Sequence, residues 1–200
     1  MTRGGGIATR AAEVRRQTAE SEIAARLTLD GSGQASIETG VPFFDHLLAA
    51  LVRHSGFDLT LRASGDLAVD VHHTVEDASI VLGQAFRQAV GRGEGIARFA
   101  SLHLPMDETL VRVALDVSGR AYLHLDLPVA TDRIGTFPTE LIEETLRAFV
   151  THAAITVHLD LVRGRNSHHI AEAAFKGLGV ALGRAVAVVG RGVPSTKGVL

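Results

Sequence analysis

Apolar residues along the chain switch repeatedly between a spacing of two and a spacing near 3.6, which predicts alternating strands and helices. Two strands around a Gly-rich turn are expected in 23–38, hairpins in 57–71 and 109–129, and a further strand in 154–167. Helices are expected in 41–56, 72–91, 138–153 and 168–186. The apolar stripe of the second helix comprises Val75, Ala78, Leu82, Ala85, Phe86 and Ala89.

This order of elements occurs twice, which indicates an internal duplication. The stretch "RLTLDGSG" (26–33) resembles "RVALDVSG" (112–119), and "FFDHLLAALVRH" (43–54) aligns with "LIEETLRAFVTH" (141–152). That alignment places His46 opposite Glu144, and His54 opposite His152. We therefore expect an α/β (α+β) fold in which residues 13–200 form one domain. It contains two pseudo-repeats, about 13–92 and 97–190, followed by a tail at 191–200.

Composition narrows the class of protein. A hydrophobic fraction of 46%, a charged fraction of 21% and a net charge of −2 are ordinary for a globular chain and suggest no nucleic-acid partner. The chain contains no cysteine, which excludes disulfides and thiolate metal sites. Residues 1–12 are Gly-rich and basic, unlike a signal peptide or membrane anchor, and we expect them to be mobile. A cytoplasmic location is compatible with these features.

The pattern His-His-x-x-Glu appears at residues 72–76 and again at 168–172. With 10 histidines in 200 residues, random order gives roughly 0.03 copies, so two copies indicate a function. Adjacent helical residues point about 100° apart, whereas residues four apart share a face. Each motif therefore offers ligands in two directions, and the pair suits two metal ions better than one. Imidazole and carboxylate ligands favour Mn²⁺, Fe²⁺ or Zn²⁺.

The simpler interpretation is that these histidines only cap helices, and Asn166 and Ser167 are indeed candidate capping residues. Two copies at equivalent positions of a repeat make this interpretation weaker, and capping and metal binding are compatible. His46 and Glu144, one in each half, are further residues of metal-binding type. His103, His124 and His158 lie in strand-like contexts, and we expect them to be structural.

The chain ends in "GRGVPSTKGVL" (190–200), where hydroxyls and an ammonium group lie on a Gly-flanked turn that suits a phosphate. A plain flexible tail is the alternative for this segment alone. Arg98 and Arg120 follow Gly-rich or turn segments, and their guanidinium groups are candidates for the same anion.

Together these stretches resemble the imidazoleglycerol-phosphate dehydratase family of histidine biosynthesis. The resemblance runs in family order from about residue 13 to 200. Its matching segments are "RQTAESEI", "LDGSG", "VPFFDHLL", "HSGFDL", "GDLAVDVHHTVEDASIVLG", "ARFA", "PMDETL", "DVSGRAYL", "GRNSHHIAEAAFK" and "PSTKGVL". It implies a hydro-lyase that converts imidazole glycerol phosphate to imidazole acetol phosphate and water.

The resemblance also implies a fold, cofactors and an assembly. The fold is a duplicated half of four strands and two helices, like the second domain of ribosomal protein S5. The resemblance implies two Mn²⁺ ions per site. It also implies trimers that assemble into a 24-subunit shell, with active sites between subunits. The implied metal ligands are His46, His72, His73, Glu76, Glu144, His168, His169 and Glu172. The implied substrate-binding residues are Glu20, His54, Arg98, Arg120, Ser195 and Lys197, to which the tail's composition adds Thr196.

For the reaction itself, metal coordination to the imidazole would stabilise the charge left when a proton departs from the neighbouring carbon. Either Glu20 or Glu172 is the candidate base, and the sequence does not choose between them. The alternatives are a non-catalytic shell held together by metal, and a dinuclear metallohydrolase acting on a phosphoester. A phosphotransferase is a weaker one, because the chain has no P-loop motif.

Overall fold

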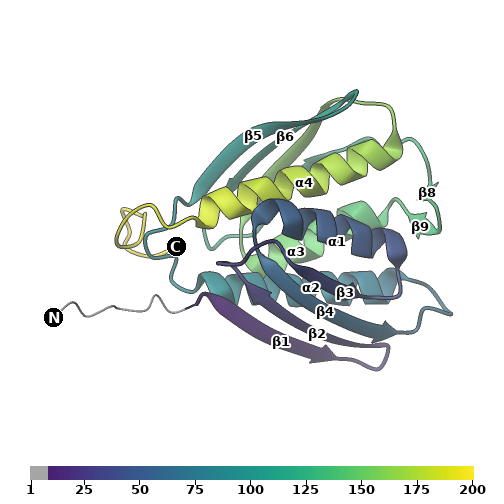
Figure 1. Cartoon of the computed structure of the whole chain (residues 1–200), viewed down its shortest axis with the longest axis horizontal. Helices are drawn as coiled ribbons and strands as arrows, with labels where there is room; N and C mark the ends of the chain where they lie inside the picture. The colour runs from purple at the N-terminus through teal and green to yellow at the C-terminus, as the bar shows by residue number, and fades with distance from the viewer. Residues whose placement is uncertain (1–8) are drawn as a thin grey trace.

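The computed structural model describes residues 9–200, and these form two four-stranded sheets with four helices between them (Figure 1). The first half contains β1 (Ala11–Gln17), β2 (Ser21–Thr28), β3 (Ala35–Glu38), α1 (Pro42–Ser55), β4 (Asp58–Gly65) and α2 (His72–Val90). The second half contains β5 (Phe99–Met106), β6 (Thr109–Asp116), β7 (Tyr122–Asp126), α3 (Leu141–Ala153), β10 (Thr156–Arg163) and α4 (Ser167–Val186). A short pair of strands, β8 (Arg133–Ile134) and β9 (Phe137–Pro138), precedes α3.

The two sheets share one topology. Their strand orders are β1-β2-β4-β3 and β5-β6-β10-β7, with the last strand parallel to its neighbour and the other pairs antiparallel. The structure therefore confirms the expected mixed fold with a duplicated half of four strands and two helices. All four predicted helices are present, and the stripe of α2 is buried as expected.

The predicted hairpins are wrong in their pairing. β4 lies between β2 and β3, and β10 lies between β6 and β7, so no predicted pair is adjacent. In 57–71 there is one strand only; Leu67 and Val69 lie in the following loop, where Val69 is 78% exposed. Period-2 spacing identifies a strand but not its partner. The chain passes from β3 through α1 and returns as β4, which inserts between β2 and β3 and lies parallel to β3.

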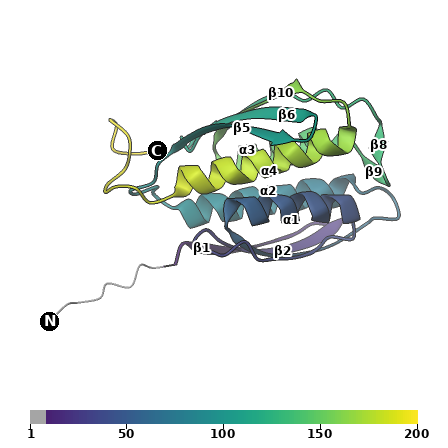
Figure 2. The same ribbon diagram turned by 45° about the horizontal axis from the view of Figure 1, so that its top comes forward.

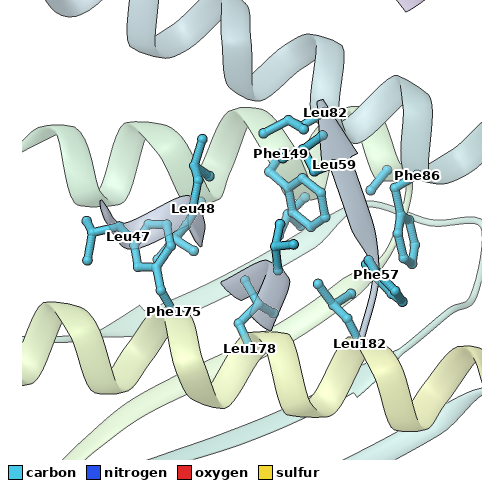
Figure 3. Packing of buried hydrophobic residues seen from close by; sticks show 14 of the residues in the cluster. Leu47, Leu48, Phe57, Leu59, Leu82, Phe86, Phe149, Phe175, Leu178 and Leu182 are labelled. Atoms are coloured by element: carbon cyan, nitrogen blue, oxygen red, sulfur yellow. The ribbon is translucent and has the colours of Figure 1, made fainter. Parts of the chain in front are cut away.

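The helices form two layers, each covering its own sheet (Figure 2). Helices α1 and α2 pack on the first sheet, whereas α3 and α4 pack on the second. The two halves meet where α1 contacts α4 and α2 contacts α3. Aromatic and leucine side chains from both layers fill this interface and leave a cavity of only about 30 Å³ (Figure 3). Burial of these side chains is the main force that joins the halves.

Glycines allow the paired helices to approach closely. A Cβ at Gly83 of α2 would lie 2.6 Å from the carbonyl oxygen of Phe149 on α3. A Cβ at Gly179 or Gly183 of α4 would likewise overlap the carbonyls of Leu51 and Ser55 at the end of α1. These contacts show that each pair of helices runs in register, so that the first turns of both members lie side by side.

The expectation that residues 1–12 are mobile is wrong for residues 10–12. Ala11 and Ala12 belong to β1, and Arg10 forms an ion pair with Asp30. Residues 1–8 lie outside the described part of the chain. Among residues 9–200, no helix has the length and apolar character needed to cross a membrane.

Candidate active site

One cluster of potential ligands lies where the first turns of α1 and α4 meet. Glu172 Oε2 is 3.1 Å from His168 Nε2 and 3.5 Å from His46 Nε2, so the cluster joins the two halves of the chain. Lys176 Nζ lies 2.7 Å from the other oxygen of Glu172. Burial raises the pKa of Glu172, but hydrogen bonds from Lys176 and His46 outweigh it and hold that pKa below its ordinary value. The carboxylate is therefore ionised at neutral pH.

The second cluster is the counterpart of the first across the duplication. His72 and Glu76 on α2 approach Glu144 on α3, and their ligand atoms all lie within 4.8 Å of one another. The aligned residues His46 and Glu144 therefore occupy equivalent positions, one beside each motif. Three nitrogen or oxygen donors at this spacing, without a thiolate, suit a borderline divalent ion in both clusters.

The second histidine of each motif points elsewhere. The ring planes of His72 and His73 differ by 82°, and those of His168 and His169 by 90°. His73 Nδ1 lies 3.0 Å from Asp66 Oδ2, and His169 Nδ1 lies 2.8 Å from Glu108 Oε2. These hydrogen bonds raise the pKa of both histidines. The geometry agrees with the expectation that each motif presents ligands in two directions.

Glu20 is placed beside the first of these pairs. Its Oε2 lies 3.6 Å from His73 Nδ1, and half of its side chain is exposed. Glu20, Asp66 and His73 also bring their ligand atoms within 4.8 Å of one another. Glu20 and His73 are predicted from the sequence, whereas Asp66 is not; it lies in the loop after β4, within the range 57–71 that predicts a hairpin.

The tail forms a separate cleft of about 600 Å³. It is lined by the predicted phosphate-binding residues Arg98, Arg120, Ser195, Thr196 and Lys197. Ser118, Pro194, Val199 and Leu200 complete its lining. Arg98 hydrogen-bonds Asp116 through Nε at 2.7 Å and donates to the carbonyl of Pro194 at 2.8 Å. The pKa of its guanidinium is raised by Asp116. Arg98 thereby connects the tail to the second sheet.

One predicted residue, His54, belongs to none of these groups. His54 is on the exposed last turn of α1, and burial, followed by the nearby cations Lys176 and Arg53, lowers its pKa. Glu108 and Lys176 were missed as functional candidates, although both belong to segments that carry the family resemblance. Glu108 precedes β6 as Glu20 precedes β2, and this repeated position was the signal that could have revealed it.

Figure 1 shows the C-terminal tail at one end of the molecule and the start of α4 at the other. The amide of Arg98 donates to the carbonyl of Ala185, at the last turn of α4, whereas His168 is on the first turn. These positions are 17 residues apart, or about 25 Å of helix. A small phosphate ester cannot reach both ends of one chain.

A family model for imidazoleglycerol-phosphate dehydratase matches residues 39–182. The chain belongs to this family.

Members of the imidazoleglycerol-phosphate dehydratase family match nearly the whole chain. The enzyme of Thermoanaerobacter sp. is 53% identical over 193 residues, covering 96% of this chain and 100% of the relative. That of Desulforudis audaxviator is 54% identical over 192 residues, covering 96% and 98%. The crystal structure of the Staphylococcus aureus enzyme gives a TM-score of 0.81 at 38% identity, covering 90% of this chain and 99% of that one. The structure of the Pyrococcus furiosus enzyme in complex with (S)-C348 gives a TM-score of 0.80 at 36% identity, covering 94% of this chain and 100% of that one.

Proposed function

We propose that this chain dehydrates imidazole glycerol phosphate to imidazole acetol phosphate in histidine biosynthesis, with two Mn²⁺ ions bound at each active site. The observation that carries the proposal is the pair of equivalent imidazole–carboxylate clusters at the helix N-termini, together with a basic cleft suited to a phosphate. The residues that would hold the metal are His46, His72, His73, Glu76, Glu144, His168, His169 and Glu172.

A divalent ion at these residues would supply Lewis acidity, which stabilises negative charge in the imidazole ring as a proton leaves the adjacent carbon. The base that takes the proton is Glu20 rather than Glu172. Both oxygens of Glu172 are occupied, one by Lys176 and the other by His168 and His46. Glu20 is half-exposed and faces His73, so its carboxylate is open to a substrate.

The cleft at the tail would bind the phosphate of the substrate. Arg120 and Lys197 provide positive charge, while Ser195 and Thr196 provide hydroxyl donors on the same turn. Arg98 is largely committed to Asp116 and Pro194, so its main contribution is to hold the tail in place. His54 would contact the substrate from α1. Binding the remote phosphate fixes the reacting carbons relative to the base.

Because the clusters and the cleft are about 25 Å apart along α4, a working site must combine the cluster end of one copy with the cleft of another. The side chains of His46, His72 and His168 are each more than 40% exposed, which leaves room for ligands from a neighbour. Val69, an apolar residue in the loop before His72, is also exposed. We propose trimers that assemble into a 24-subunit shell with shared active sites, located in the cytoplasm.

The experiment that tests this function is a turnover assay with imidazole glycerol phosphate. Chelator treatment should abolish formation of the ketone product, and Mn²⁺ should restore it. Release of inorganic phosphate in place of the ketone would favour the metallohydrolase. Assembly without turnover would favour the non-catalytic shell. Either of these results would contradict the proposed function.

A further inference from the structure

We infer that Glu108 and Asp66 are positioning residues that hold His169 and His73, the second histidines of the two motifs, in the orientation needed for metal binding. The inference rests on the proposed function, because it concerns how the metal site is built. Each carboxylate accepts a hydrogen bond at Nδ1, which leaves Nε2 as the nitrogen with a free lone pair. Neither carboxylate belongs to the eight proposed ligands.

Glu108 is built into its place from several sides. Its Oε2 accepts from His169 Nδ1 at 2.8 Å, while its Oε1 accepts from the backbone amides of Arg165 and Asn166 at 3.3 and 3.0 Å. The side chain of Asn166 in turn caps α4 by accepting from the amides of His168 and His169. The two loop amides therefore hold the Glu108 carboxylate in place against the imidazole of His169.

Asp66 reaches His73 from a different element. It follows β4, and its Oδ2 lies 3.0 Å from His73 Nδ1. Its Oδ1 is buried and has no hydrogen-bond partner within residues 9–200. A buried carboxylate oxygen left in this state lowers stability. The bond to His73 with the other oxygen unpartnered favours a role in orienting His73 over a role in stabilising the fold.

The two halves use an equivalent carboxylate in different ways. Glu20 and Glu108 both stand immediately before the inner strand of their sheet and both approach the second histidine of a motif. Glu108 makes the hydrogen bond itself, whereas Glu20 stays at 3.6 Å and Asp66 makes the bond in its place. Asp66 thereby leaves the carboxylate of Glu20 available to the substrate. The first half supplies the base, and the second half uses the equivalent carboxylate only for positioning.

The test is a double-mutant cycle read by Mn²⁺ affinity, measured by isothermal titration of the metal-stripped full chain. We expect Glu108→Ala and Asp66→Ala each to weaken Mn²⁺ binding about 10- to 100-fold at one class of site. The double variant Glu108→Ala/His169→Ala should bind no more weakly than His169→Ala alone, because Glu108 acts through that ring. The same should hold for Asp66 and His73. Glu13→Ala, an exposed carboxylate on β1, is the matched control and should bind as the wild type does.

Glu108→Gln provides a second variant that keeps the side-chain length and an acceptor oxygen, and we expect it to recover most of the affinity lost in Glu108→Ala. Additive losses in the double variants, or unchanged affinity in the single ones, would overturn the inference. Failure of the proposed function is a separate result: the wild type would bind Mn²⁺ without turnover, while the affinity cycle would still decide the positioning roles.

Discussion

Glu20 and Glu172 differ in how their oxygens are occupied. Glu172 is buried and bonded to three cationic or imidazole groups, and burial together with those bonds suits a permanent ligand. Glu20 is half-exposed at the end of a turn. A base must be able to reach the substrate and exchange a proton, which favours Glu20.

Replacement of Glu20 by Gln should therefore lower kcat by about 10²- to 10⁴-fold with little change in Mn²⁺ content. Glu172→Gln should lower both, since it removes a charged ligand. Steady-state kinetics combined with metal analysis separates the two outcomes. Near-normal turnover of Glu20→Gln would remove Glu20 from the chemistry.

Asp77 gives a prediction about pH. It accepts hydrogen bonds from Arg16 and Ser21, which outweigh the effect of burial and hold its pKa below the ordinary value of 3.8. A lowered folded-state pKa stabilises the protein above pH 3.8, and this contribution is lost as pH falls through the folded-state value. Asp77→Asn should cost about 1.5–3 kcal/mol at neutral pH.

Urea unfolding of the metal-stripped protein across a pH series measures the Asp77 effect. The difference between wild type and Asp77→Asn should shrink only below pH 3.8. A difference that already disappears near pH 6 would show that Asp77 does not carry it.

Several site residues were predictable because their type and spacing have a direct chemical meaning. His72, Glu76, His168 and Glu172 occupy helical positions that face one way, and this follows from the sequence alone. Asp66 and Glu108 gain their roles from contacts with helices that start 6 and 59 residues later. A single carboxylate in a loop or turn has no such pattern, so its role becomes visible only when the fold brings it to a histidine.

At the scale of elements, close packing of α2 against α3 determines the second ligand cluster. Gly83 permits this approach, and an alanine there would place Cβ 2.6 Å from the carbonyl of Phe149 and 2.9 Å from the amide of Ala153. Backbone atoms cannot move aside as a flexible side chain can. The helices would have to separate, and their first turns would move with them.

We expect Gly83→Ala to destabilise the protein by about 1–3 kcal/mol, the usual cost of overpacking, and to weaken Mn²⁺ binding. Thermal unfolding in chelator and metal titration measure the two effects. Gly190→Ala is the matched control, because nothing lies within 4 Å of a Cβ at that position. Equal behaviour of the two variants would mean that helix spacing does not govern the cluster.

The helices were predictable from periodicity, and the strand partners were not. α1 begins at Pro42 and ends before Gly56, which adopts a positive φ of 77°, as the sequence indicated. The segment before β3 resembles a hairpin turn, but Asp58 at the start of β4 accepts hydrogen bonds from the amides of Ser32 and Gln34. Contacts between distant segments of this kind set the strand order. The edge strands β1 and β5 were not among the expected elements; β1 has one buried residue and β5 has none.

At the scale of the whole molecule, the duplication places the first turns of all four helices at one end and the tail at the other. The cluster of His46, His168 and Glu172 and the cluster of His72, Glu76 and Glu144 each combine one helix from each half, so neither of these two is complete within one half. The cleft belongs to the second half and the tail only. The sequence identified both groups of residues but gave no distance between them, and that distance is what requires a second copy.

Co-expression of two inactive variants tests the shared site most directly. One variant, His72→Ala/His168→Ala, lacks metal ligands; the other, Arg120→Ala/Lys197→Ala, lacks the phosphate site. In mixed assemblies, some sites combine the intact cleft of the first variant with the intact metal ligands of the second. We expect purified mixed assemblies to recover activity in proportion to the fraction of such sites that random assortment produces. Assemblies of the first variant with a chain carrying all four substitutions should stay inactive. Mixed assemblies that remain as inactive as either parent would contradict an active site shared between copies.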